Sequence, residues 1–316
     1  MVKIFRFFLI FLIVLGFFVW YCFQPKGGAE KIFVINKGDS VYPIAERLEK
    51  EKIIRNKFAF LVYLKLSQKT DKIQAGSFRL SGKDSFSILT EKLSKGRLDK
   101  WVIILEGWRA EEVAEKLGEE LSIDGKDFLK LAETKEGYLF PDSYLIPEGT
   151  DAEKILEILT RNFEKKWQEL IKNTENLNLT KKQIVILASL VEREAKDDND
   201  RKTVAGILLK RWESGWPLQV DATAQYIKAG KTCLNKANCD WWPKVSSADL
   251  KIKSSFNTYL EKGLPPSPIC NPSFSSLSAA VNPTESDYWY YLSDKFGKMH
   301  YGKTLAEHNE NIEKYL

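Results

Sequence analysis

Histidine and cysteine are scarce in this chain of 316 residues, and their scarcity limits the metal chemistry open to it. There are two histidines, His300 and His308, and four cysteines. Zinc sites are built from cysteine and histidine pairs at short, regular spacings, and no such spacing occurs here. We therefore expect no metal site and no cofactor.

An excess of charge of one sign is also missing. The 48 basic residues nearly balance the 43 acidic ones, which leaves a formal net charge of +5. Nucleic-acid-binding proteins usually carry a strongly basic patch, so this balance argues against a nucleic-acid partner. The balance does not exclude binding to a cell wall or to a membrane surface. The length is sufficient for one or two domains with a large core.

A hydrophobic run stands near the N-terminus. The segment Phe7–Phe23 is uncharged and follows Lys3 and Arg6. A run of about 17 such residues can span a bilayer, and basic residues on one flank keep that end in the cytoplasm. A cleaved signal peptide is the alternative, but no small-x-small cleavage site follows the run. The sequence therefore predicts a single-pass protein of the inner (plasma) membrane, with the large C-terminal part on the periplasmic or extracellular side.

Two of the cysteines are close in sequence. Cys233 and Cys239 bracket a short loop, and on the oxidising side of a membrane they are expected to form a disulfide. Cys270 is a competing partner for either of them. The fourth, Cys22, lies in the hydrophobic run.

Turn and cap signals divide the rest of the chain into short helices and strands, so the predicted fold class is α+β. The domains expected are a cytoplasmic N-terminus with a transmembrane helix (1–24), a small α+β subdomain (25–98) and a larger mixed α+β domain (99–316). Helices are expected near 41–50, 57–66, 85–93, 109–118, 126–132, 151–173, 180–195 and 200–213. Strands are expected near 31–35, 74–80 and 101–105, a structured loop over 136–147, and short strands and loops after Trp216.

The helix predicted over 180–195 ends in two glutamates. Thr180 is its expected N-cap, and apolar residues cover most of its circumference, so the helix should be mostly buried. At about 100° per residue, Glu192 and Glu194 point in different directions. A carboxylate in such a setting is either paired or has a raised pKa. Ion pairs with Arg193, Arg201 or Lys202 are the alternative to a catalytic role.

Polar residues suited to sugar binding follow further along the chain. The stretch Gln219–Tyr226 alternates polar and small residues, so an extended segment would present Gln219, Asp221 and Thr223 on one face. A half-buried edge strand with a wet polar face is the alternative. Asn257 and Tyr259 provide an amide and a ring, which suit either sugar contacts or a turn.

Six ordered motifs occur along the chain. They are Glu136-Gly-Tyr-Leu-Phe-Pro-Asp-Ser-Tyr144, Leu187-Ala-Ser-Leu-Val-Glu-Arg-Glu194, Leu218-Gln-Val-Asp-Ala-Thr223, Phe256-Asn-Thr-Tyr259, Gly263-Leu-Pro-Pro266 and Glu307-His-Asn309. Together they resemble the motifs of the endolytic murein transglycosylase family (MltG or YceG-like). A chance match to six ordered motifs is very improbable. The stretch 32–96 resembles the family's LysM-like subdomain. Ser267 and Ser273 depart from the family's glycines, and 233–242 resembles an insertion.

The resemblance implies an enzyme that cuts the β-1,4 bond from MurNAc to GlcNAc in nascent peptidoglycan and leaves 1,6-anhydro-MurNAc ends. It places the catalytic glutamate in the Glu-x-Glu pair. We favour Glu194, at the helix end where a cleft can open, and expect Glu192 to orient or pair with a neighbour. The residues expected to bind substrate are Gln219, Asp221, Thr223, Tyr226, Asn257 and Tyr259. The expected partners are peptidoglycan strands and, at the membrane, peptidoglycan synthases.

Two other functions stay open on the sequence alone. One is a non-catalytic scaffold that binds peptidoglycan, although the intact Glu192 and Glu194 argue against it. The other is a muramidase that uses water, with Asp221 as its second carboxylate. A lytic transglycosylase needs no such water, because the 6-hydroxyl of the substrate attacks intramolecularly and one glutamate serves first as acid and then as base.

Overall fold

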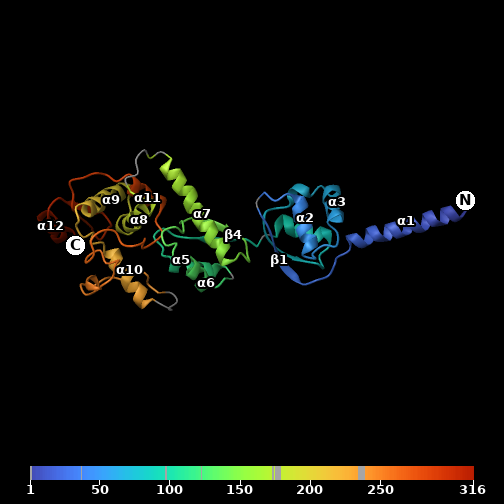
Figure 1. Ribbon diagram of the computed structural model, residues 1–316, viewed down its shortest axis with the longest axis horizontal. Coiled ribbons are helices and arrows are strands. Elements are labelled where there is room, and N and C mark those ends of the chain that lie inside the picture. Colours follow the sequence, from blue (N-terminus) through green and yellow to red (C-terminus); the bar gives the residue numbers. More distant parts are fainter. Residues whose placement is uncertain are drawn as a thin grey trace. The chain divides into compact units, whose positions relative to one another are not determined.

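The chain folds into a mixture of helices and strands in two compact units. The computed structural model describes residues 2–36, 38–96, 98–121, 123–172, 174, 179–233 and 239–316. The first unit consists of Met1–Trp101 with Leu145–Thr150, and the second of Val102–Tyr144 with Asp151–Leu316 (Figure 1). Each unit has its own hydrophobic core.

In the first unit, helices pack with a two-stranded antiparallel sheet made of β1 (Glu30–Ile35) and β2 (Gly76–Ser81). Strand β1 pairs with β2 so that Glu30 lies opposite Ser81 and Ile35 opposite Gly76. Phe33 and Phe78 turn inward from the two strands and are fully buried. The elements are α1 (Val2–Phe23), β1 (Glu30–Ile35), α2 (Val41–Lys50), α3 (Lys57–Leu66), η1 (Thr70–Lys72), β2 (Gly76–Ser81) and α4 (Phe86–Lys95). Helices α2 and α3 match the predicted ranges, and the predicted helix over 85–93 is confirmed as α4.

The second unit is mainly helical. It contains α5 (Ala110–Glu120), α6 (Gly125–Ala132), α7 (Ala152–Ile171), α8 (Lys181–Glu194), α9 (Asp198–Glu213), α10 (Asp221–Thr232), η2 (Asp249–Lys251), α11 (Phe274–Val281), β5 (Tyr290–Ser293), β6 (Met299–Gly302) and α12 (Leu305–Tyr315). Strand β3 (Lys100–Ile103) pairs with β4 (Ser143–Ile146), and β5 pairs antiparallel with β6. Strand β4 falls inside the predicted loop over 136–147.

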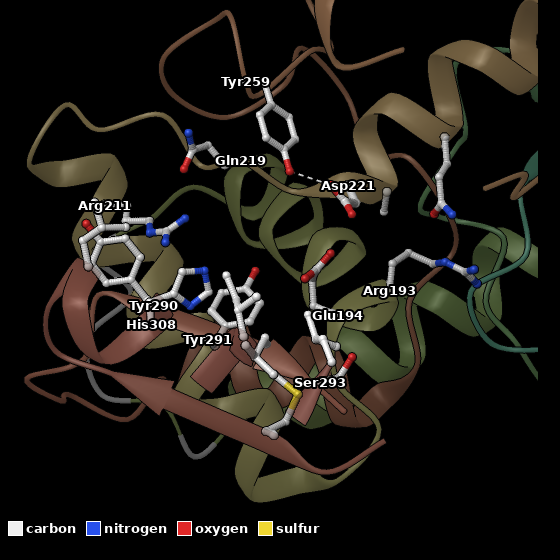
Figure 2. Close-up of a pocket in the computed structure, with 17 residues that line it drawn as sticks. Arg193, Glu194, Arg211, Gln219, Asp221, Tyr259, Tyr290, Tyr291, Ser293 and His308 are labelled. Carbon is white, nitrogen blue, oxygen red and sulfur yellow. Dashed lines mark hydrogen bonds between the residues drawn. The ribbon is translucent and has the colours of Figure 1, made fainter. Parts of the chain in front are cut away.

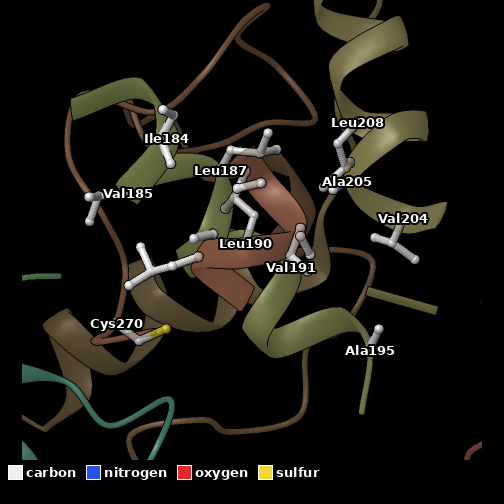
Figure 3. Packing of buried hydrophobic residues seen from close by; sticks show 14 of the residues in the cluster. Ile184, Val185, Leu187, Leu190, Val191, Ala195, Val204, Ala205, Leu208 and Cys270 are labelled. Carbon is white, nitrogen blue, oxygen red and sulfur yellow. The ribbon is translucent and has the colours of Figure 1, made fainter. Parts of the chain in front are cut away.

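Helix α8 lies at the centre of the core of the second unit. Thr180 caps it, because its hydroxyl accepts from the Gln183 backbone N–H while the Gln183 side chain accepts from the Thr180 N–H. Every residue from 184 to 191 is buried. Helices α9 and α11 pack against α8 and against each other, and the labelled side chains of α8 and α9 meet in one cluster (Figure 3). The predicted helix over 180–195 and its burial are therefore confirmed.

The expected membrane anchor is not supported. Among the residues that the structure describes, no helix is both long enough and apolar enough to cross a membrane. A crossing requires about 20 consecutive, mostly apolar residues. This finding contradicts the prediction of a transmembrane helix in 1–24 and of a single-pass position in the inner (plasma) membrane.

The predicted disulfide is present in the second unit. Cys233 is bonded to Cys239 with their Cα atoms 5.5 Å apart, while Cys270 is a free, buried thiol. Cys270 lies against helix α8, where its thiol donates to the Ser189 carbonyl oxygen. The competing pairing with Cys270 is therefore wrong.

The chain after Trp216 is more helical than predicted. The stretch Gln219–Tyr226 was expected to be extended, but α10 begins at Asp221. Gln219 adopts a positive φ of 53°, which interrupts the extended backbone, and after the extended cap Val220 the helix begins. Helices α11 and α12 were also not predicted.

Candidate active site

Helix α8 delivers Glu194 to the edge of the core. Its buried run stops at Val191, and Glu194 is the last helical residue before the cap Ala195. A pocket of about 580 Å³ opens there, with the Glu194 carboxylate inside it (Figure 2). The other residues that line this pocket are Arg193, Arg211, Gln219, Asp221, Ala222, Gln225, Tyr259, Tyr290, Tyr291, Leu292, Ser293, Met299, Leu305, His308, Ile312 and Leu316.

The surroundings of Glu194 raise its pKa to about 7. Burial is the main cause, since removal from water disfavours the charged form, and the negative charge of Asp221 acts in the same direction. A hydrogen bond with Tyr291 and the positive charges of Arg211 and Arg193 act in the opposite direction. A carboxyl group with a pKa near neutrality can donate a proton and later accept one, as general acid–base catalysis requires.

Asp221 faces Glu194 from the start of helix α10 (Figure 2). Its carboxylate accepts a hydrogen bond from the Tyr259 hydroxyl, which fixes its position. Next to it, Gln219 is held in its left-handed conformation by a backbone bond to the Thr258 carbonyl oxygen, 3.0 Å long. Such backbone conformations are rare outside glycine and tend to occur at functional sites. The structure thus brings Gln219, Asp221 and Tyr259 to the pocket of Glu194.

The other three predicted substrate residues do not line this pocket. Thr223 is fully buried, and its hydroxyl donates to the Val220 carbonyl oxygen. The helical start at Asp221 explains this, because residues two apart on a helix point about 200° apart instead of sharing a face. Asn257 is buried too, and its amide donates to two backbone carbonyls. Tyr226 packs on Phe256 and on Arg109.

Glu192 has a different environment from Glu194. Its carboxylate accepts hydrogen bonds from the Ser273 backbone N–H (2.8 Å) and hydroxyl (2.6 Å). It also forms an ion pair with Arg201, 3.3 Å long, and only 5% of its side chain is exposed. Through these bonds, Glu192 connects helix α8 to α9 and to the loop that precedes α11.

The same loop is attached to α8 at a second point. The hydroxyl of Ser189 accepts from the Ile269 backbone N–H. Asn271 then joins this loop to the motif that begins at Glu136, because its amide oxygen accepts from the Gly137 and Leu139 N–H groups and its NH₂ donates to Glu136. The Glu136 motif therefore supports the loop that is attached to α8, and it does not line the pocket of Glu194.

The sequence prediction missed several residues of the pocket. Arg211 comes from helix α9, Tyr290 and Tyr291 come from β5, and His308 comes from α12. The run Tyr288-Trp-Tyr-Tyr was the available signal, because aromatic rings commonly form the walls of sugar sites. His308 was considered structural, and it stacks on Tyr290 with ring centroids 5.2 Å apart.

In the part of the chain that the structure describes, no group of three or more histidine, cysteine, aspartate or glutamate side chains is placed to hold a metal ion.

Comparisons with known proteins agree on one family. The profile of the YceG-like family matches residues 33–314. An endolytic murein transglycosylase of Bacillus subtilis is 28% identical over 312 residues, which cover 89% of this chain and 84% of that protein. One from Streptococcus pneumoniae is 27% identical over 323 residues, and the match covers 89% of this chain but only 58% of the pneumococcal protein.

A solved structure supports the same assignment. The 2.6 Å crystal structure of a yceG-like protein from Listeria monocytogenes aligns with a TM-score of 0.57 and 26% sequence identity. The alignment covers 89% of this chain and 99% of that one.

Proposed function

This chain belongs to the YceG-like family, as its motifs predicted, and from that premise we propose that it is a lytic transglycosylase that cuts the glycan strands of peptidoglycan. The activity named for its relatives supports this at the level of the family. The observation that carries the proposal is the Glu194 carboxyl group, which lies inside a pocket and has a pKa of about 7. We assign to the chain internal cleavage of nascent strands, which limits their length.

In the proposed reaction, Glu194 acts twice. Its protonated carboxyl donates a proton to the oxygen that links MurNAc to GlcNAc, and the bond from C1 to that oxygen breaks. The 6-hydroxyl of the same MurNAc attacks C1 and returns its proton to the Glu194 carboxylate, which closes the 1,6-anhydro ring. The attack is fast because the 6-hydroxyl and C1 belong to the same sugar. The negative charge of Asp221 stabilises the positive charge that develops on the sugar ring.

The position of Asp221 also favours a second candidate, a muramidase. A hydrolytic glycosidase needs a second carboxylate to activate water or to attack the sugar. Asp221 faces Glu194 across the pocket and is held there by Tyr259. The two reactions share Glu194 and differ in whether water or the 6-hydroxyl attacks C1.

Product mass separates these reactions. We expect purified protein incubated with peptidoglycan to release fragments that end in 1,6-anhydro-MurNAc, each lighter by one water than the reducing-end product of hydrolysis. Reducing ends would establish the muramidase. Release of neither product, under conditions in which the protein binds the strands, would establish a binding scaffold.

For the first unit, we assign a LysM-like role in positioning the strand without chemistry. Its two most plausible acids are both ion-paired: Asp39 to Arg47 at 2.5 Å and Glu46 to Lys57 at 2.7 Å. A pocket of about 600 Å³ lies within this unit, and Asn36 is one of the residues that line it. A peptidoglycan synthase as protein partner stays a prediction from sequence.

Filling that pocket tests the positioning role. We expect Asn36→Trp to lower kcat/KM on long strands several-fold and to leave kcat/KM on short soluble fragments unchanged, because only a long strand can reach both units. The control is Lys50→Trp, at an exposed position outside the pocket. Equal losses on long and short substrates would show that this unit does not act by binding glycan.

A further inference from the structure

Arg211 is a buried cation without an ion-pair partner among the residues that the structure describes. Only 6% of it is exposed, although it lines the pocket of Glu194. Its Nε donates to the Trp289 carbonyl oxygen (2.8 Å) and its Nη1 to the Leu218 carbonyl oxygen (2.7 Å). No carboxylate in the described part of the chain lies within ion-pair distance of it. Buried cations are usually paired, because desolvation of an unpaired charge is costly.

Within the described ranges, the two backbone bonds leave part of the guanidinium group without a hydrogen-bond partner. A guanidinium carries five N–H donors, and these bonds use two of them. Figure 2 shows the Arg211 group in the pocket beside His308 and below Gln219, with Tyr291 between it and Glu194. The remaining donors are therefore at a site that is separate from the proton-transfer group but in the same pocket.

Arg211 is also the main positive charge on this side of the pocket. Burial and the charge of Arg211 lower the pKa of His308, so the imidazole is neutral at pH 7. Arg193, the other arginine that lines the pocket, is exposed and stacks on Trp242, with 3.8 Å from its Cζ to the ring centroid. Solvent screens an exposed charge far more than a buried one.

A buried guanidinium with free donors is best suited to a carboxylate or a phosphate, which it can bind through two parallel hydrogen bonds. In a peptidoglycan strand the GlcNAc residues are neutral. The muramoyl residues carry a 3-O-lactyl group, which ends in a carboxylate where no peptide is attached and leads to peptide carboxylates where one is.

We propose that Arg211 forms a subsite that binds a carboxylate of the muramoyl residue and so selects the register in which the strand enters the pocket. This proposal rests on the proposed function and adds a specificity-determining residue to it. In the correct register, the carboxylate of the substrate supplies the charged partner that Arg211 lacks among the described residues. In a register shifted by one sugar, a neutral GlcNAc would leave the cation unpaired, which is unfavourable.

Chemical neutralisation of the carboxylates tests the proposal on the wild-type protein. Two pairs of strands of equal length are compared by kcat/KM: peptide-free strands with free or amidated lactyl carboxyls, and peptide-bearing strands with free or amidated peptide carboxyls. We expect amidation to lower kcat/KM about tenfold or more in one pair, since a charge-assisted hydrogen bond is lost. The pair that responds identifies the source of the carboxylate. Equal values within both pairs would refute the proposal.

Variants of the two pocket arginines assign the effect to a residue. Arg211→Met is expected to lower kcat/KM on the responding strand to the value for its amidated form, without a further loss on the amidated form. A purely structural role would lower both values equally. Arg193→Met should keep the preference, and its disappearance in that variant instead would move the subsite to Arg193.

The chemical identity of the product, and not the preference between strands, tests the proposed function. Anhydro ends in the product, at any rate of cleavage, support the transglycosylase even if no preference for the carboxylate is found. If Arg211→Met does not fold, the comparison of strands with wild-type protein still decides the question.

Discussion

Replacement of Glu194 by glutamine is expected to lower the rate of glycan cleavage by about a thousandfold, within the range that a positioned general acid contributes. The amide has nearly the shape of the carboxyl group but has no proton of suitable acidity to donate. The rate is measured as release of anhydro ends from purified strands. Glu261→Gln is the matched control, because the Glu261 side chain is exposed and makes no hydrogen bond or ion pair among the described residues.

The same variant should be at least as stable as the wild type above neutral pH. The pKa of Glu194 is raised in the folded protein to about 7 from an ordinary value of 4.5, so folding disfavours its ionised form. This penalty is absent below about pH 4.5, grows as the pH rises towards 7 and is complete above it. At 1.36 kcal/mol per pKa unit, removal of the charge should stabilise the protein by about 3 kcal/mol at pH 8 and by almost nothing at pH 4.

Urea unfolding of both proteins at pH 4 and pH 8 measures this difference. An inactive variant that is also less stable at pH 8 would mean that the ionised carboxylate stabilises the fold, as in an ordinary ion pair. Catalysis itself should follow the protonated form, so kcat/KM of the wild type is expected to fall as the pH rises above about 7. A variant that keeps near-wild-type cleavage would exclude Glu194 as the acid.

Local signals were sufficient to predict the helix that carries the site. A capping residue, Thr180, precedes a run of apolar residues too long for a strand, so helix α8 follows from capping and burial alone. The change from apolar to acidic residues at its end also placed Glu192 and Glu194 at the edge of the core. The sequence also favoured Glu194 as the acid and expected Glu192 to orient or pair with a neighbour, with Arg201 among the candidates. The contact of Glu192 with Ser273 was not predictable, because Ser273 is reached only through the tertiary fold.

The rest of the pocket comes from distant parts of the chain, and local patterns describe it poorly. The alternation of polar and small residues after Gln219 suits an extended segment, yet short patterns of this kind do not distinguish a strand from a helix. The backbone bond from Gln219 to Thr258 turns the chain, and the helix then begins at Asp221. Arg211 was missed because the sequence shows a charged residue near a helix end, which is normally exposed.

The buried bonds of Glu192 predict a second large effect, on the stability of the protein. Replacement of Glu192 by alanine is expected to lower the free energy of unfolding by about 3 kcal/mol, the cost of breaking a buried ion pair by removing one partner. The loss leaves the Ser273 N–H and hydroxyl without this acceptor and leaves Arg201 with the exposed Asp198, 3.4 Å away, as its remaining acidic partner among the described residues. Arg201 is poorly placed to compensate, because its Nε is already buried without a partner among the described residues.

Chemical unfolding, followed by tryptophan fluorescence, measures this effect. The control is Glu261→Ala, which removes an exposed carboxylate that has no partner among the described residues and should change stability by less than about 0.5 kcal/mol. Glu192→Gln should fall between the two, because the amide oxygen still accepts from Ser273 while the ion pair with Arg201 is lost. Both Glu192 variants should cleave glycan at the wild-type rate per folded molecule, since neither removes the proton donor. The opposite result would be a Glu192→Gln variant that unfolds like the wild type but does not cleave glycan, together with an active Glu194→Gln variant. The acid would then be Glu192, and the hydrogen bonds from Ser273 would orient a catalytic group.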